Sequence, residues 1–271
     1  MAAKSKKQME LKSQPGFAGM AVVCLVVLYA PILILMIWSL NSGNIVTHWE
    51  GVSLSWYGVA LQNEEFHAAA ANTLIISFSA TFLSTLMATM AAIGMTRVKP
   101  WRGIGFAFMI VNLPLMVPEI ITAVATLSFF ALLAGQFHLN FGIGNIILAH
   151  TVFCIPFAYM PIRARLEDMD LTLDNAAADL YATPWQTFRR ITFPLMLPGI
   201  FSGLALAFIV SFDDFTITQL IAGPGQTTLP LYIWNQIRRP MTPEINAIST
   251  ILLLVSILFV SVSFFIARRR N

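Results

Sequence analysis

Long stretches without a charged residue constrain the fold of this 271-residue chain more than any other feature. They include residues 13–49, 66–96, 103–118, 120–162, 191–212 and 245–267. A helix needs about 20 apolar residues to cross the hydrocarbon core of a bilayer, and residues 103–162 have room for two such helices. The sequence therefore predicts six membrane-spanning helices, at about 18–40, 69–95, 104–131, 143–162, 196–220 and 245–267.

Charged residues make up only 11% of the chain, whereas soluble domains contain about 25%. This difference excludes an ordinary soluble domain and predicts an all-α integral membrane protein in which residues 1–271 form a single transmembrane domain. The apolar run that begins at Phe17 is too long for a cleaved signal peptide and is expected to remain as the first span.

Basic residues predict the orientation of the helices. Apart from Arg238 and Arg239, every Lys and Arg lies in the N-terminal segment, the second connection, the fourth connection or the C-terminal tail. Loops rich in these residues stay in the cytoplasm, so both termini are expected to be cytoplasmic. The net charge of +3 then reflects membrane topology and not a nucleic-acid partner.

The cytoplasmic connection from about 163 to 193 is unusually long and carries helix signals. Thr172 is expected to cap a helix that ends near Ala182. Thr183, Pro184 and Gln186 then predict a capping box and a second helix, which runs to about 192 before the next span begins. Two short helices at a bend form either an amphipathic hairpin on the bilayer or a docking element for a cytoplasmic partner.

The sequence of this connection, "DNAAADLYATPWQTFRRITFPLMLPGI", resembles the conserved cytoplasmic loop of bacterial ABC importer permeases. The family pattern is Glu-Ala-Ala, three residues, Gly, nine residues, then Ile-x-Leu-Pro. Three positions differ: Asn175 replaces the Glu, Tyr181 the Gly and Phe193 the Leu. Tyr181 is therefore expected to adopt the bend that Gly normally allows. The resemblance implies that an ATPase contacts Asn175, Ala176, Ala177, Asp179, Tyr181, Thr183, Pro184, Ile191 and Pro194, with Ala177 pressed into its groove.

Further motifs are similar to the permease subunits of spermidine/putrescine importers, and more to the second subunit than to the first. They are "WYGVALQNEEF", "VPEIITA", "SFDDF", "GPGQTTLPL" and "PEINAIST". The resemblance implies six helices of the type I importer architecture in a bacterial inner membrane. It also implies a second permease subunit, two copies of a cytoplasmic ATPase and an extracytoplasmic solute-binding protein.

The chain itself offers no sign of an enzyme. None of its lysines lies in the G-x-x-x-x-G-K-[ST] pattern that an ATP-binding P-loop needs, so ATP and Mg are expected on the partner ATPase and no cofactor on this chain. His150 and Cys154 are four residues apart on one predicted helix, which favours packing over a metal site.

Three acids lie inside predicted spans: Glu119, Asp213 and Asp214. Counted from the cytoplasmic ends of their helices, Glu119 and Asp213 lie at about the same depth, roughly 22 Å into the membrane. Adjacent helical residues point about 100° apart, so one aspartate is expected to face a pathway while the other pairs with a neighbour. Intramembrane acids are functional by default, and here they predict a cation path; the alternative is that all three are structural counter-charges or caps.

Residues 222–244 read as an outward loop or a partly re-entrant gate. Tyr232 and Trp234 could add cation–π faces to the pathway or serve as packing. Arg238 and Arg239 could meet acids of a docked binding protein, or pair with Glu244 or lipid. The first outer loop, with Trp56, Tyr57, Glu64 and Glu65, is expected to form a short interfacial helix.

The sequence thus predicts a permease subunit of an ATP-driven polyamine importer. One alternative is the same architecture carrying another small cationic or amino-acid-derived solute. The other is a stand-alone secondary transporter, although no inverted repeat is visible between the halves.

Overall fold

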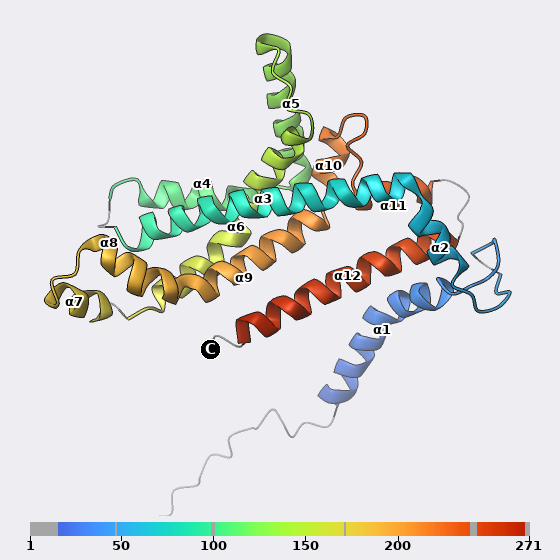
Figure 1. Ribbon diagram of the computed structural model, residues 1–271, viewed down its shortest axis with the longest axis horizontal. Helices are drawn as coiled ribbons and strands as arrows, with labels where there is room; N and C mark the ends of the chain where they lie inside the picture. The colour runs from blue at the N-terminus through green and yellow to red at the C-terminus, as the bar shows by residue number, and fades with distance from the viewer. Residues whose placement is uncertain (1–15, 47, 99–100, 171, 239–242, 269–271) are drawn as a thin grey trace, which may run out of the picture. The chain divides into compact units, whose positions relative to one another are not determined.

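The chain is almost entirely helical in the computed structural model, which describes residues 16–46, 48–98, 101–170, 172–238 and 243–268 (Figure 1). Its contacts define two compact units, which we describe separately: residues 1–60 with 241–250, and residues 61–240 with 251–271. The basic residues before Gly16 and after Arg268, together with Lys99 and Arg239, lie outside the described residues.

The first unit contains α1 (Phe17–Trp38) and most of α2 (Ser55–Gln62), joined by a compact loop. Asn41 organises this loop from a fully buried position: its amide donates to the carbonyl of His48 at 2.6 Å, and its side-chain oxygen accepts from the backbone N–H of Glu50 at 3.0 Å. α2 confirms the short helix expected around Trp56 and Tyr57. Glu64 and Glu65 instead begin the next helix.

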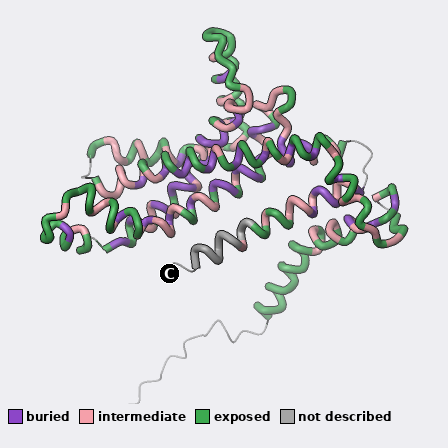
Figure 2. Tube along the Cα trace, in the orientation of Figure 1, coloured by how far each residue is buried: buried purple, intermediate pink, exposed green. Residues whose placement is uncertain are grey.

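Three long helices form the core of the second unit: α3 (Glu64–Thr96), α6 (Ile143–Glu167) and α9 (Phe193–Phe212). They run side by side, and Figure 2 shows buried residues along their facing sides. Small residues such as Ala80, Ala88 and Ala158 are fully buried and allow the helices to approach closely. A Cβ atom on Gly203 of α9 would lie 2.6 Å from the carbonyl oxygen of Ala158 on α6, so only glycine fits there.

Within the described residues, five helical segments are long and apolar enough to cross a membrane. They are α1, α3, α5 (Glu119–Phe137), α6 and the continuous helix from Pro184 to Phe212. The predicted sixth span falls on α12 (Pro243–Arg268), of which the segment up to Leu258 is apolar but shorter than that limit. All-helical membrane architecture is therefore confirmed, while the count of six and the orientation of the termini stay predictions.

Two predicted spans are broken, which corrects the sequence-based boundaries. The expected helix 104–131 consists of α4 (Ile104–Met116) and α5, separated at Val117 and Pro118. Val117 is extended because a residue before proline avoids the helical region. The expected helix 196–220 ends at Phe212 and resumes as α10 (Thr216–Ile221) after residues 213–215. Both breaks occur beside the intramembrane acids.

The connection between α6 and α9 contains the two predicted helix starts. α7 spans Thr172–Asp179 and α8 spans Pro184–Thr187. The capping box is confirmed: Thr183 Oγ1 accepts from the backbone N–H of Gln186, and the Gln186 side chain accepts from the backbone N–H of Thr183. The second helix does not stop near 192, because a π-helical turn, η2 (Phe188–Thr192), joins it directly to α9.

The start of α7 differs slightly from the prediction. Thr172 is the first helical residue, and the carboxylate of Asp170 accepts a hydrogen bond from its backbone N–H at 2.9 Å. This bond and the Thr172 hydroxyl hold the pKa of Asp170 below its usual range. An acid before the first turn also suits the positive end of the helix dipole.

Tyr181 terminates α7 as the sequence predicts. Its φ angle is 57°, in the left-handed region that glycine normally occupies. The backbone N–H of Ala182 donates to the carbonyl of Ala177 at 3.0 Å, and that of Tyr181 donates to Ala178 at 2.9 Å. These two bonds form a Schellman motif with a tyrosine at the glycine position.

Residues 222–228 form the irregular outer loop that was expected, and α11 (Leu229–Ile237) follows as a helix that was not. The loop is attached to the start of α3. Asn72 Nδ2 donates to the carbonyls of Gly225 and Thr227 at 2.9 and 3.0 Å, and Thr73 Oγ1 accepts from the backbone N–H of Leu229 at 2.7 Å.

Candidate functional site

The two helix breaks place the starts of α5 and α10 beside one cavity. The cavity has a volume of about 360 Å³. It is lined by Glu119, Phe153, Ile209, Val210, Asp213, Asp214, Phe215 and Thr216. The expectation that the three intramembrane acids lie at one level is therefore met, and we call this space the acid cavity.

Asp214 is the buried member of the acid cavity. Its side chain is 1% exposed. Its carboxylate accepts from the backbone N–H groups of Ile217 and Thr218 at 3.3 and 3.0 Å and from the Thr218 hydroxyl at 3.0 Å. Asp214 thereby satisfies donors at the start of α10 that have no partner within the helix.

His150 of α6 completes this network. Its Nε2 lies 3.0 Å from Asp214 Oδ2 and 3.1 Å from Thr218 Oγ1, and its Nδ1 lies 2.9 Å from Ser211 Oγ. With a proton on Nε2 the ring donates toward Asp214, and Nδ1 pairs with the Ser211 hydroxyl, so both ring nitrogens have a partner. The network fixes both sides of the break between α9 and α10.

Glu119 and Asp213 face the open part of the acid cavity. Asp213 is exposed and Glu119 half-buried. Glu119 lies in the first turn of α5, where its carboxyl group interacts with the side chains of Asp214 and Thr216. As expected, one of the adjacent aspartates pairs with a neighbour while the other remains available to a ligand. Their separation follows from the chain leaving the helix at residue 213.

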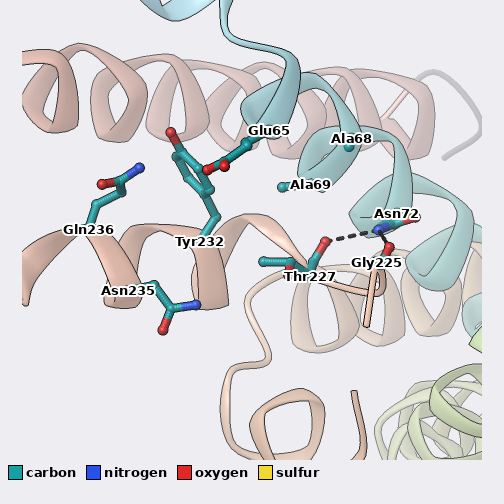
Figure 3. Close-up of a pocket in the computed structure, with 9 residues that line it drawn as sticks. All are labelled: Glu65, Ala68, Ala69, Asn72, Gly225, Thr227, Tyr232, Asn235 and Gln236. Carbon is teal, nitrogen blue, oxygen red and sulfur yellow. Dashed lines mark hydrogen bonds between the residues drawn. The ribbon is translucent and has the colours of Figure 1, made fainter. Parts of the chain in front are cut away.

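Neither Tyr232 nor Trp234 lines the acid cavity, whereas Phe153 and Phe215 do. Tyr232 is buried, and its hydroxyl accepts from Asn63 Nδ2 at 3.0 Å. It lines a second cavity near the start of α3 (Figure 3). Trp234 packs against Phe215 with ring centroids 5.1 Å apart, and the guanidinium of Arg238 lies 5.2 Å from the Trp234 ring. Trp234 therefore reaches the acid cavity only through Phe215.

His150 is the residue that sequence reasoning missed. It was interpreted as a packing residue, because only its neighbour Cys154 on the same helix was considered as a partner. A titratable residue in a predicted span needs a polar partner, and an aspartate in another span at a similar depth was the available signal. Among the described residues no group of three or more His, Cys, Asp or Glu side chains could hold a metal ion.

The predicted coupling residues form a folded surface between α7 and α8. Ala177, which was expected to face the ATPase, is instead buried within the chain, so its predicted place in a groove of the partner does not fit this conformation. Asn175, Ala176 and Asp179 are exposed. Large apolar side chains lie beside them: Leu180, Tyr181 and Trp185 are 81%, 94% and 66% exposed.

Arg97 connects the surface formed by α7 and α8 to the core. It lies at the end of α3, and its Nη1 is 2.9 Å from Asp174 Oδ2 on α7. Its Nη2 donates to the carbonyl of Leu166 on α6 at 3.0 Å. A planar guanidinium suits this two-sided contact, because its donors point in fixed directions. The position of α7 is thereby tied to two of the three core helices.

Broken apolar helices around an acid cavity, combined with a structured connection between α6 and α9, are typical of a membrane transport protein. The chain belongs to the family of binding-protein-dependent transport system inner membrane components, whose family model matches residues 80–270. Members of that family are permease subunits of bacterial inner membranes.

Two permeases of Escherichia coli strain K12 are similar to this chain over most of its length. The putrescine transport system permease protein PotI is 40% identical over 229 residues, which cover 83% of this chain and 81% of PotI. The spermidine/putrescine transport system permease protein PotC is 34% identical over 245 residues, which cover 90% of each chain.

Solved structures share the fold. A chain of a bacterial ABC transporter involved in the import of alginate superposes with a TM-score of 0.75 at 19% identity, covering 93% of both chains. A chain of the MetNI methionine ABC transporter gives a TM-score of 0.65 at 17% identity, covering 81% of this chain and all of the other. At these identities the similarity concerns the fold alone.

Proposed function

We propose that this chain is a permease subunit of an ABC importer for putrescine or spermidine, and that the polyamine passes the acid cavity. The observation that carries the proposal is the pair of carboxyl groups, Glu119 and Asp213, that line the acid cavity at the breaks in two apolar helices. A polyamine carries ammonium groups along a flexible chain, and spaced carboxylates bind such groups. The identity to PotI and PotC supports this substrate class.

In this proposal the subunit works in a larger assembly. A second permease subunit completes the pathway, an extracytoplasmic binding protein delivers the substrate, and two copies of a cytoplasmic ATPase bind ATP and Mg and dock on the connection between α6 and α9. The exposed side chains of Leu180, Tyr181 and Trp185 support a docking role, because large apolar groups rarely stay exposed without a partner.

Transport by the assembled complex tests the proposal. The complex is purified with its ATPase, reconstituted in liposomes and supplied with binding protein and ATP, and uptake of radiolabelled putrescine and spermidine is measured. We expect ATP-dependent uptake of at least one of them in excess of uptake of histidine and methionine. Uptake of an amino acid instead would support the alternative substrate class, and uptake without the ATPase would support a secondary transporter.

A further inference from the structure

The second cavity lies where the start of α3 meets the outer loop and α11 (Figure 3). Its volume is about 310 Å³, close to the lower limit for small-ligand sites. It is lined by Glu65, Ala68, Ala69, Asn72, Gly225, Thr227, Tyr232, Asn235 and Gln236. In the predicted topology this end of α3 is extracytoplasmic, so we call this space the mouth cavity.

The walls of the mouth cavity are held in place before any ligand arrives. Asn72 binds two carbonyls of the outer loop, Thr73 binds the first residue of α11, and Asn63 binds the hydroxyl of Tyr232. These bonds join residues more than 150 positions apart in the sequence. A site with fixed walls loses little entropy when it binds a small molecule.

The chemistry of the mouth cavity favours a cation. Glu65 is its one charged lining residue, and none of the nine lining residues is basic. Within the described parts of the chain no Lys, Arg or His side chain forms an ion pair with Glu65. Asn235 and Gln236 add amide oxygens, and Tyr232 adds an aromatic ring to the lining. A carboxylate, amide acceptors and a ring suit an ammonium group on a short aliphatic chain.

Helix α11 connects this cavity to the acid cavity. Tyr232, Asn235 and Gln236 line the mouth cavity, whereas Trp234 packs on Phe215, which lines the acid cavity. Helix α11 therefore lines the mouth cavity directly and contacts the acid cavity only through Phe215. A single carboxylate binds one end of a diamine weakly, which suits a site that the substrate must leave again.

We propose that the mouth cavity is an entry site that binds an alkyl-diamine or polyamine through Glu65 before the substrate reaches the acid cavity. The proposal rests on the proposed function for the identity of the substrate. Its evidence is separate, because none of the mouth-cavity residues lines the acid cavity.

Protection of an introduced cysteine tests the entry site without transport. In the complete complex, without ATP, Cys24 and Cys154 are replaced by Ser and Asn235→Cys places a thiol in the cavity wall. The thiol is modified with cationic aminoethyl methanethiosulfonate and with its anionic sulfonatoethyl analogue. We expect the cationic reagent to be favoured about three- to tenfold by the nearby carboxylate, and millimolar putrescine to slow the modification.

Glu65→Gln should remove both the reagent preference and the protection by putrescine. Glu64→Gln is the matched control, since Glu64 is the adjacent acid in the same turn and does not line the cavity. Equal behaviour of the two variants would overturn the entry site. Protection by substrate-free binding protein, with none by putrescine alone, would also overturn it and identify the cavity as a protein contact. If either of these two results is found in a complex with normal polyamine uptake, the entry site is refuted but the proposed function is not. If the complex takes up no polyamine, the proposed function is refuted, whatever the result of the cysteine modification.

Discussion

His150 of α6 and Asp214, which precedes α10, meet in a buried contact in which Nε2 of the histidine lies 3.0 Å from Oδ2 of the aspartate. The contact joins positions 64 residues apart and supports the chain where it leaves the helix at residue 213. Two adjacent aspartates are tolerated in this apolar region because their carboxylates have different surroundings. Asp214 is satisfied by protein donors, and Asp213 is left to the acid cavity.

This division predicts different defects for the two aspartates. Asp214→Asn replaces one acceptor oxygen by an amide that faces the N–H groups of Ile217 and Thr218, and His150→Ala removes a donor from the carboxylate. Leaving a buried polar group without a partner costs about 1–3 kcal/mol. We expect both variants to give less folded complex and a lower midpoint of thermal inactivation in detergent. Asp213→Asn is the matched control and should assemble normally.

The accessible acids should control transport instead. Asp213→Asn and Glu119→Gln keep the size of the side chain and remove its charge. A lost carboxylate–ammonium contact of roughly 1–3 kcal/mol corresponds to a decrease in uptake of about ten- to hundredfold. Radiolabelled polyamine uptake by complexes of equal abundance measures the effect, and Asp213→Glu should retain more activity than Asp213→Asn. Normal uptake in both neutral variants would exclude a cation path through the acid cavity.

The sequence predicted what depends on composition and local signals. The apolar runs identified the helices, the Thr183–Gln186 capping box was correct, and Tyr181 adopts the left-handed bend because the motif leaves no other residue for it. The depth count predicted that Glu119 and Asp213 lie close together, and both residues line the acid cavity.

The features that could not be predicted from the sequence depend on tertiary contacts. A proline in a membrane span permits either a kink or a full break of the helix, and in this fold the helix breaks before Glu119. The contact of His150 with Asp214 requires the packing of α6 against α9 and α10, and the burial of Ala177 requires the fold of the connection. No local pattern specifies these pairs.

The orientation of the chain can be tested by labelling. Single cysteines that replace Lys6 and Arg269 should be shielded from a membrane-impermeant thiol reagent in intact cells, because the distribution of basic residues predicts cytoplasmic termini. A cysteine that replaces Glu64 should react, and all three should react after the membrane is permeabilised. Reaction at position 269 but not at position 6 in intact cells would require an odd number of spans.

Two substitutions, one in α7 and one directly after it, separate docking from folding. Leu180 is 81% exposed and Ala177 is buried. Leu180→Asp places a charge on the surface that we expect to meet the ATPase, and desolvating an unpaired charge there should cost several kcal/mol of association. The permease should then insert normally while ATPase co-purification and substrate-stimulated hydrolysis fall. Ala177→Asp should instead reduce the amount of folded permease. Normal coupling in Leu180→Asp would favour an amphipathic hairpin on the membrane surface.

Tyr181 allows the strain of its backbone to be separated from the contacts of its ring. A residue other than glycine in the left-handed region costs of order 1 kcal/mol, and the ring of Tyr181 is 94% exposed, so contacts within this chain do not offset that cost. Tyr181→Ala removes the ring and keeps the strain, whereas Tyr181→Gly removes both.

If the ring contacts the ATPase, both variants should bind the ATPase more weakly than the unchanged permease. The Gly variant should still bind it more tightly than the Ala variant, by up to about fivefold, because its backbone adopts the bend without strain. Binding of the purified ATPase to permease in lipid nanodiscs measures the comparison. Equal affinities of Tyr181, Ala and Gly proteins would show that the bend forms without cost and that the ring makes no contact, and this would remove Tyr181 from the docking surface.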